Sequence, residues 1–155
     1  YYMFTGTVFK SEYLGGDGIW RDTRLDRGYI VNALGGKEWV WGKKRRHIFN
    51  LNLRLSYQGG DHYTPVNKAA SMTYKNIVYD ETKAYSKRFS PALTMDVGVS
   101  YKLKGKRVSH EFELQLLNLT GYTGQHGYQY NEKLDGVEKV EVSNILPDIS
   151  YRVRF

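Results

Sequence analysis

Strict alternation of apolar and polar residues over stretches of about ten residues is the feature that most constrains this chain. Between Leu93 and Leu103 every second residue is apolar, and the residues between them are polar or small. The same pattern returns from Phe49 to Gln58 and from Ile149 to Phe155. Because successive side chains of a β-strand point to opposite faces, a period of two predicts strands with one apolar and one polar face.

Three further segments complete a prediction of six antiparallel strands and an all-β fold class. Segment 108–119 alternates and then slips near Leu116-Leu117, where a bulge is expected. Segments 1–13 and 29–41 are rich in strand-forming residues, and Gly35-Gly36 is expected to kink the second. The predicted strands are residues 1–13, 29–41, 48–58, 92–103, 108–119 and 145–155.

The connections between these strands alternate in length. Segments 42–47 and 104–107 are short, whereas 14–28, 59–91 and 120–144 are long. Short turns on the periplasmic side and long loops outside are typical of outer-membrane β-barrels. A soluble antiparallel sheet with one face on a core fits the periodicity equally well, but it does not require this order of connections.

A barrel gives each face of the strands a role. The polar stripe, with Arg54, Asp96, Arg152 and Arg154, is expected to face a wet lumen, and the Leu, Val and Phe stripe to face lipid. Trp39 and Trp41 abut a short turn, as an interfacial aromatic girdle requires. Since six strands cannot close a useful barrel, residues 1–155 are predicted to be the C-terminal part of a plugged barrel of about 22 strands.

The start of the sequence and its composition limit the classes of protein and partner to be considered. The chain starts at Tyr1-Tyr2 without a signal peptide, and we expect it to be a piece cut from a longer sequence. It has 155 residues, no Cys and a formal net charge of +7. The densest basic runs, Lys43 to Arg46 and Lys102 to Arg107, fall at predicted turns and are expected to be solvated. Nucleic acid is therefore not expected as a partner.

The end of the chain resembles the C-terminal signature of outer-membrane barrel proteins. Tyr151, Val153 and Phe155 supply its alternating apolar residues and terminal aromatic. The resemblance implies that the barrel-assembly machinery recognises these three residues.

Longer stretches, in order along nearly the whole chain, resemble the last strands of Bacteroidetes-type TonB-dependent receptors. The resemblance implies energised uptake of a ligand such as a siderophore or an oligosaccharide through a plugged barrel in the bacterial outer membrane. It also implies outer-membrane lipid and the TonB complex as partners, the latter through N-terminal parts that these residues lack. A soluble all-β binding or surface module remains the alternative. The stretches are Ser11-Glu12-Tyr13, Gly16 to Arg21, Asn32 with Leu34 to Trp39, Leu53 to Tyr57, Gly59-Gly60 with Tyr63 to Pro65, Tyr79 to Glu81 with Ala84 to Ser86 and Arg88, and His110 to Phe112 with Leu117 to Thr120.

No arrangement of residues predicts an enzyme, a cofactor or a metal site. The carboxylates between Asp17 and Asp26 lack the spacing of a twelve-residue calcium loop. The four histidines, His47, His62, His110 and His126, are scattered, and metal ligation needs convergent donors. Asp80 and Glu81 are expected to pair with loop cations such as Lys83 or Arg88 instead of forming a catalytic pair.

Tyrosines are concentrated in the long loops. Aromatic side chains give rigid contact area at low entropic cost, which suits ligand capture, although packing within the loops explains them equally well. The candidate ligand-binding residues are Tyr63, Tyr79, Tyr85, Arg88 and Tyr128.

Overall fold

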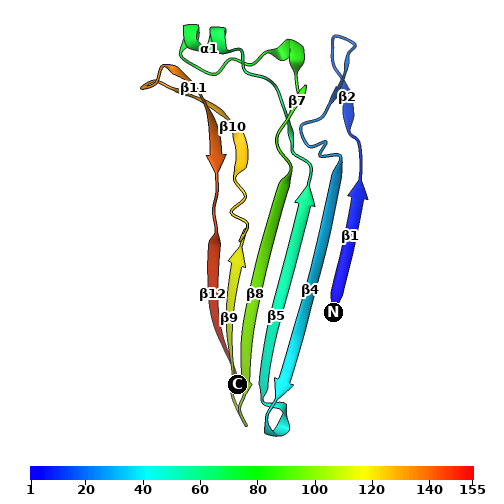
Figure 1. The fold of residues 1–155 in the computed structure, drawn as a ribbon, viewed down its shortest axis with the longest axis vertical. Helices are drawn as coiled ribbons and strands as arrows, with labels where there is room; N and C mark the ends of the chain where they lie inside the picture. The colour runs from blue at the N-terminus through cyan, green and yellow to red at the C-terminus, as the bar shows by residue number, and fades with distance from the viewer.

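The computed structural model describes the backbone of residues 1–155 and every side chain except those of Gln125 and His126. Its centre is one antiparallel sheet of six strands, in which each strand pairs with the next one along the chain in the order β1-β4-β5-β8-β9-β12 (Figure 1). The predicted all-β antiparallel class is therefore confirmed. The six strands are β1 (Tyr2–Val8), β4 (Tyr29–Trp41), β5 (His47–Gln58), β8 (Ala92–Lys104), β9 (Ser109–Leu117) and β12 (Leu146–Arg154).

The first strand is shorter than predicted. It ends at Val8, and residues 12–14 instead form β2 (Glu12–Leu14), which pairs with β3 (Trp20–Asp22) in a separate hairpin. The backbone N–H of Phe9 donates to the carbonyl of Gly28, which closes the base of this loop next to the end of β4. Strand-forming composition continues past Val8, but the sheet partner does not, since Val8 pairs with Tyr29 at the first residue of β4.

The expected irregularities at Gly35-Gly36 and Leu116-Leu117 are both wrong. The β4–β5 register runs unbroken from Ile30 opposite Gln58 to Trp41 opposite His47. Gly36 serves close packing, because a Cβ there would lie 2.5 Å from the Tyr1 ring.

The slip in alternation near Leu116 marks the end of a strand. The pairing of β9 with β12 is in register up to Leu117, and Asn118 then adopts a left-handed φ of 55°. The chain leaves the sheet at that point.

The long connections all lie at one end of the sheet and the short turns at the other (Figure 1). The first turn carries the 3-10 helix η1 (Lys43–Arg45), and residues 105–108 form the second. Loop 59–91 contains β6 (His62–Tyr63), α1 (Lys68–Tyr74), η2 (Glu81–Lys83) and β7 (Lys87–Arg88), and loop 118–145 contains the hairpin of β10 (Gly124–Asn131) and β11 (Gly136–Val142).

Helix is sparse in this chain. Within the described part of the structure, no helix has the length and apolar character needed to traverse a bilayer.

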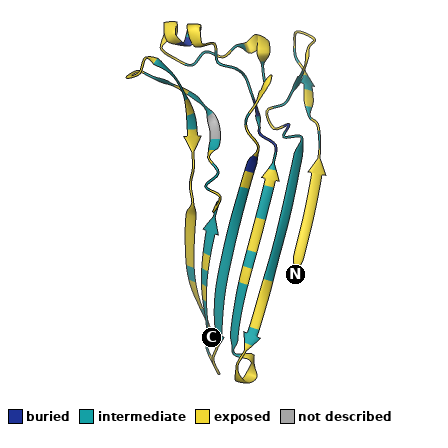
Figure 2. Ribbon diagram, in the orientation of Figure 1, coloured by how far each residue is buried: buried dark blue, intermediate teal, exposed yellow. Residues whose placement is uncertain are grey.

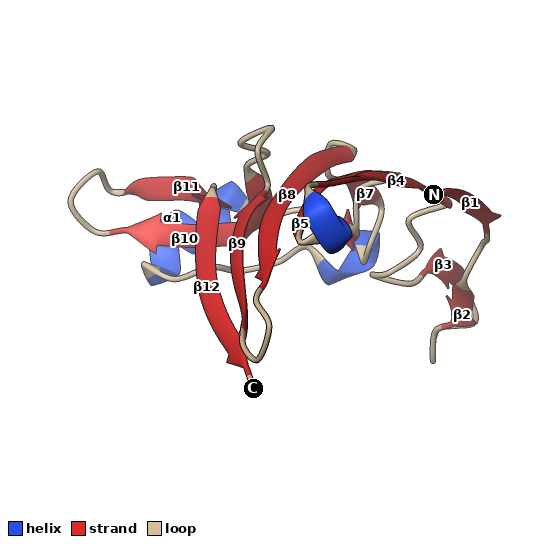
Figure 3. Cartoon of the chain, turned by 90° about the horizontal axis from the view of Figure 1, so that it is seen from below, coloured by secondary structure: helices blue, strands red, loops and turns tan.

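The sheet buries almost none of its own apolar side chains completely, and most residues of β4 and β8 are half-buried (Figure 2). Among the residues whose burial is described, Ala92 is the one buried hydrophobic residue. Large apolar side chains of the sheet, such as Phe4, Phe112 and Ile149, are 71%, 55% and 78% exposed. Viewed from the short-turn end, the strands form an open, curved row from β12 to β1 (Figure 3). The sheet is thus a wall without a core of its own.

Two buried glycines, Gly59 and Gly60, let the chain leave β5 against neighbouring backbone. A Cβ on Gly60 would lie 2.0 Å from the carbonyl oxygen of Phe89, and one on Gly59 would lie 1.9 Å from that of Arg27. Backbone atoms cannot swing away as a flexible side-chain end can.

We expect Gly60→Ala to lower the free energy of unfolding by about 3 kcal/mol, because the added methyl group must displace backbone. Gly16→Ala is the matched control, since a Cβ there meets nothing within 4 Å; its effect should stay within about 0.5 kcal/mol. Urea unfolding, followed by circular dichroism, measures both. Equal stability of the two variants would contradict this packing.

Candidate functional site

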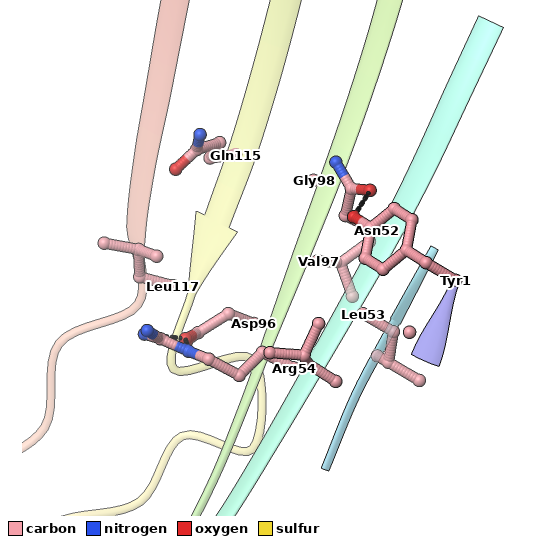
Figure 4. Close-up of a pocket in the computed structure, with 11 residues that line it drawn as sticks. Tyr1, Asn52, Leu53, Arg54, Asp96, Val97, Gly98, Gln115 and Leu117 are labelled. Carbon is pink, nitrogen blue, oxygen red and sulfur yellow. Dashed lines mark hydrogen bonds and ion pairs between the residues drawn. The ribbon is translucent and has the colours of Figure 1, made fainter. Parts of the chain in front are cut away.

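The polar face of the sheet is organised around two ionic clusters. In the first, the Nε of Arg54 on β5 donates to Oδ2 of Asp96 on β8 at 2.7 Å, directly across the strand pair (Figure 4). The other Asp96 oxygen accepts from the backbone N–H of Asn118 at 2.9 Å. Asp96 thereby fixes both its neighbouring strand and the start of the third long loop.

Glu111 on β9 is the centre of the second cluster. Its Oε2 lies 3.7 Å from Nζ of Lys102, 3.9 Å from Nη1 of Arg152 and 3.8 Å from Nη2 of Arg154. This oxygen is buried and has no hydrogen-bond partner among the described groups, so three cations at longer range neutralise it. All four residues predicted for a polar face, Arg54, Asp96, Arg152 and Arg154, therefore share one face of the sheet.

A shallow hollow of about 300 Å³ lies over the polar face (Figure 4). Tyr1 forms one side, where its hydroxyl donates to Oδ1 of Asn52 at 2.6 Å, and Arg54, Asp96 and Gln115 form others. The hollow offers hydrogen-bonding groups across several strands and little enclosure. Such a surface suits a polar polypeptide segment packed along the sheet better than a small molecule.

The opposite face is mainly apolar, although Lys37 also lies on it. Its aromatic residues lie at its two ends and, as Tyr2 and Phe4 of β1, along one edge. At the short-turn end the rings pair across strands: Trp39 with Phe49 at 5.6 Å, Trp41 with Tyr101 at 6.2 Å, and Phe112 with Tyr151 at 4.5 Å between centroids. At the long-loop end Tyr29 lies 5.4 Å from Tyr57. Aliphatic residues fill most of the band between, namely Val31, Ala33, Leu51, Leu53, Leu55, Met95, Val97, Val99, Leu114 and Leu116.

A second hollow, of about 480 Å³, lies among the long loops. Four of the five candidate ligand-binding residues line it: Tyr63, Tyr79, Tyr85 and Tyr128. Residues far apart in the sequence meet here, because the β10 hairpin lies against loop 59–91, where the hydroxyl of Tyr128 donates to that of Tyr63, 65 residues away, at 3.3 Å. Whether these side chains contact a ligand stays a prediction.

The walls of this loop pocket are held rigidly by ring contacts. Tyr63 stacks on Phe89 with centroids 4.3 Å apart, and Tyr13 meets Tyr85 edge-on at 6.2 Å. Burial, followed by the hydrogen bond with Tyr63, raises the pKa of the Tyr128 hydroxyl to about 12. Tyr128 is therefore a neutral hydrogen-bond donor at physiological pH.

Arg88, the fifth candidate, lies behind the pocket and joins two loops, residues 9–28 and 59–91. Its Nε donates to Nε2 of His62 at 2.9 Å, and its Nη2 donates to the carbonyl of Asp26 at 2.9 Å. The Asp26 carboxylate is buried and lies 3.7 Å from the same Nη2. Because Nε2 of His62 accepts, its Nδ1 carries the proton and donates to the carbonyl of Tyr85 at 2.8 Å.

Asp22, Asp26 and His62 bring possible metal-ligand atoms within 4.8 Å of one another. Nothing in the spacing of these residues predicts the grouping, since His62 is 36 residues from Asp26 and only loop closure unites them. Both imidazole nitrogens are already engaged, and the Arg88 guanidinium occupies the cation position. The cluster therefore works as an ionic link between loops, and the predicted lack of a metal stays a prediction.

The remaining sequence predictions fall outside these groups. Asp17 pairs with Arg21, which holds the pKa of the Asp17 carboxyl well below its usual range. Nζ of Lys83 lies 3.3 Å from Oδ2 of Asp80, as expected, whereas Arg88 pairs with Asp26.

The structure also places three of the four histidines and the three assembly-signal residues. His47 and His110 each contact a tyrosine hydroxyl at 2.7 Å, those of Tyr101 and Tyr151, whereas the side chain of His126 lies outside the described residues. Of the three assembly-signal residues, Tyr151 lies on the apolar face with Val153, and Phe155 is 98% exposed.

The comparisons with known proteins identify no relative. No protein family matches the sequence, and neither the curated proteins nor the solved structures give a match.

We expect Arg88→Met to loosen loop 59–91, because it leaves the buried Asp26 carboxylate without its cation. The cost should be about 1–3 kcal/mol, since the Arg88 side chain is itself partly exposed. Limited proteolysis of the loop measures the change. Lys87→Met, at the adjacent exposed position, is the control and should cut at the wild-type rate. Equal protection of the two variants would show that Arg88 is dispensable to the loops.

Proposed function

We propose that residues 1–155 form six consecutive strands in the wall of a TonB-dependent transporter of the bacterial outer membrane. The observation that carries the proposal is the two-faced sheet, with ionic clusters on one side and, on the other, a half-buried to exposed aliphatic band with aromatic rows at its ends. A lumen-facing and a lipid-facing surface on one wall are what a membrane barrel requires.

Strand length supports the same reading. The strands β4 and β8 each have 13 residues. At about 3.3 Å per residue such a strand is about 43 Å long, and a tilt of about 45° gives about 30 Å along the membrane normal, the thickness of a bilayer core. The aromatic rows then fall near the two interfaces.

A soluble binding module is the alternative, but the lack of a buried apolar core in this sheet argues against it. A soluble sheet stabilises itself by burying its apolar stripe, which contributes roughly 25 cal/mol per Å². Here that stripe faces outward, and the outer edges of β1 and β12 keep backbone groups that need further strands as partners. Closure by more strands of the same barrel satisfies both requirements.

The proposed partners follow from this placement. The polar face and its shallow hollow take a plug, outer-membrane lipid covers the apolar face, and the barrel-assembly machinery inserts the wall. The aromatic loop pocket takes a small-molecule or oligosaccharide ligand, and a TonB complex supplies the energy through parts of the protein beyond these residues. The chain itself carries out no chemical reaction in this proposal.

Nitroxide scanning of β8 tests the placement of the wall. The chain has no native Cys, so single Cys variants at Val97, Gly98, Val99 and Ser100 can each be labelled in the protein that carries this segment, reconstituted in bilayers. Labels at 97 and 99 should collide mainly with oxygen, and labels at 98 and 100 with a water-soluble nickel chelate. A uniform profile, or inaccessibility of 97 and 99 to both reagents, would refute the membrane wall.

A matched pair of arginine substitutions on β9 gives an energetic test. Leu114 is on the apolar face, and its neighbour Gln115 is on the polar face, where its Nε2 donates to Glu113. Leu114→Arg should cost about 2–4 kcal/mol of folding free energy in bilayers, because it places a cation in hydrocarbon. Gln115→Arg, at nearly the same depth, should be tolerated. Folding titrations in lipid vesicles report both values, and equal costs would count against the assignment of faces.

A further inference from the structure

The whole excess of positive charge in the chain lies at the short-turn end. The sequence has 23 basic and 16 acidic residues. The two short turns together with the first residue of β5 and the last residue of β8, residues 42–47 and 104–108, contain seven basic residues and no acidic one, so 16 of each sign remain elsewhere. These seven residues, here called the turn cations, are Lys43, Lys44, Arg45, Arg46, Lys104, Lys106 and Arg107.

The fold gathers the turn cations into one surface. The backbone N–H of Lys104 donates to the carbonyl of Arg46 at 2.8 Å, which joins the two turns side by side. All of the seven except Arg46 are exposed. Among the side chains that the structure describes, none of the seven has an acidic partner within 4.0 Å. Folding of the turns therefore leaves the charges free for an external partner.

The surroundings of the turn cations indicate which anion they suit. Trp39, Trp41 and Tyr101 lie on the apolar face directly beside them. Next to the second turn, a hollow of about 300 Å³ is lined by Lys104, Arg107 and Phe155, among others. Cations adjoining an aromatic and aliphatic surface match an amphiphile with a phosphate head and hydrocarbon tails. A nucleic acid or an acidic peptide offers nothing to the apolar side.

We propose that the turn cations bind the headgroups of anionic phospholipids in the leaflet that the short turns face. The inference rests on the proposed function, because it requires the sheet to stand in a bilayer with its aromatic end row at the interface. Lysine and arginine near an anionic leaflet each raise the association constant about fivefold. Several cations around one hollow then enrich anionic lipid locally.

The two tryptophans beside the turns report the enrichment. The protein that carries this segment is reconstituted in phosphatidylethanolamine bilayers that contain phosphatidylglycerol, with bromine on the acyl chains of one lipid at a time. Quenching of Trp39 and Trp41 is obtained as the difference from a Trp39→Phe, Trp41→Phe variant. We expect brominated phosphatidylglycerol to quench them at least about threefold more per mole than brominated phosphatidylethanolamine, and the ratio to fall towards one as salt screens the charges.

Neutralising lysines tests the role of the turns. Replacing Lys43, Lys44, Lys104 and Lys106 together with Gln should bring the quenching ratio close to one. The control replaces four lysines at the long-loop end, Lys68, Lys75, Lys87 and Lys133, with Gln, and should keep the wild-type ratio.

Each result has a defined meaning. Strong quenching with equal ratios for the two lipids overturns this inference and leaves the membrane wall intact. A ratio that survives in the turn variant overturns it as well, since the preference then comes from other groups. Absence of quenching by either lipid shows that the aromatic row does not reach acyl chains, and overturns both this inference and the proposed function.

Discussion

Unbroken register across six strands is the constraint on which this structure depends. Because side chains alternate strictly along a strand, a slip of one residue at any of the five strand pairings would move Leu and Val onto the polar face and Arg and Asp onto the apolar one. The ion pair of Arg54 with Asp96 and the ring pair of Trp39 with Phe49 lie on opposite faces of the same sheet. Both exist only in this register.

The strands of the sheet could be predicted from the local alternation of residues. The end of β1 and the packing at Gly36 could not, because they depend on which distant residues lie beside them. Alternation located β5, β8, β9 and β12 to within about three residues at their ends. Composition alone extended β1 to residue 13, because nothing in the residues shows that β4 begins at Tyr29 and leaves no partner beyond Val8. Gly36 suggests a kink for the same reason, since the Tyr1 ring that fills its space lies 35 residues away in the sequence.

The candidate sites also fall into those that a local sequence pattern predicts and those that only the fold brings together. The two-residue alternation along the strands predicts the polar residues of the sheet. The concentration of tyrosines in the long loops predicts those that line the loop pocket. The link of Asp26, His62 and Arg88 left no trace in the sequence, because its members are brought together by closure of two loops and have ordinary spacing. The sequence alone therefore predicts Arg88 as a ligand contact, whereas in the structure its Nε and Nη2 donate to His62 and Asp26.

The two ends of the sheet treat charge in opposite ways, and stability explains only one of them. At the long-loop end some cations are paired within or between the loops, as in Arg21 with Asp17 and Arg27 with Asp61. Order is needed there over many residues that have no regular strand pairing. Short turns are held by the strands they connect and need no such pairs. Seven like charges on two adjoining turns repel one another and add nothing to the fold; in the proposed arrangement an anion outside the polypeptide offsets that repulsion. The position of that anion, beside a row of aromatic rings, ties the charge of the turns to whatever covers the apolar face.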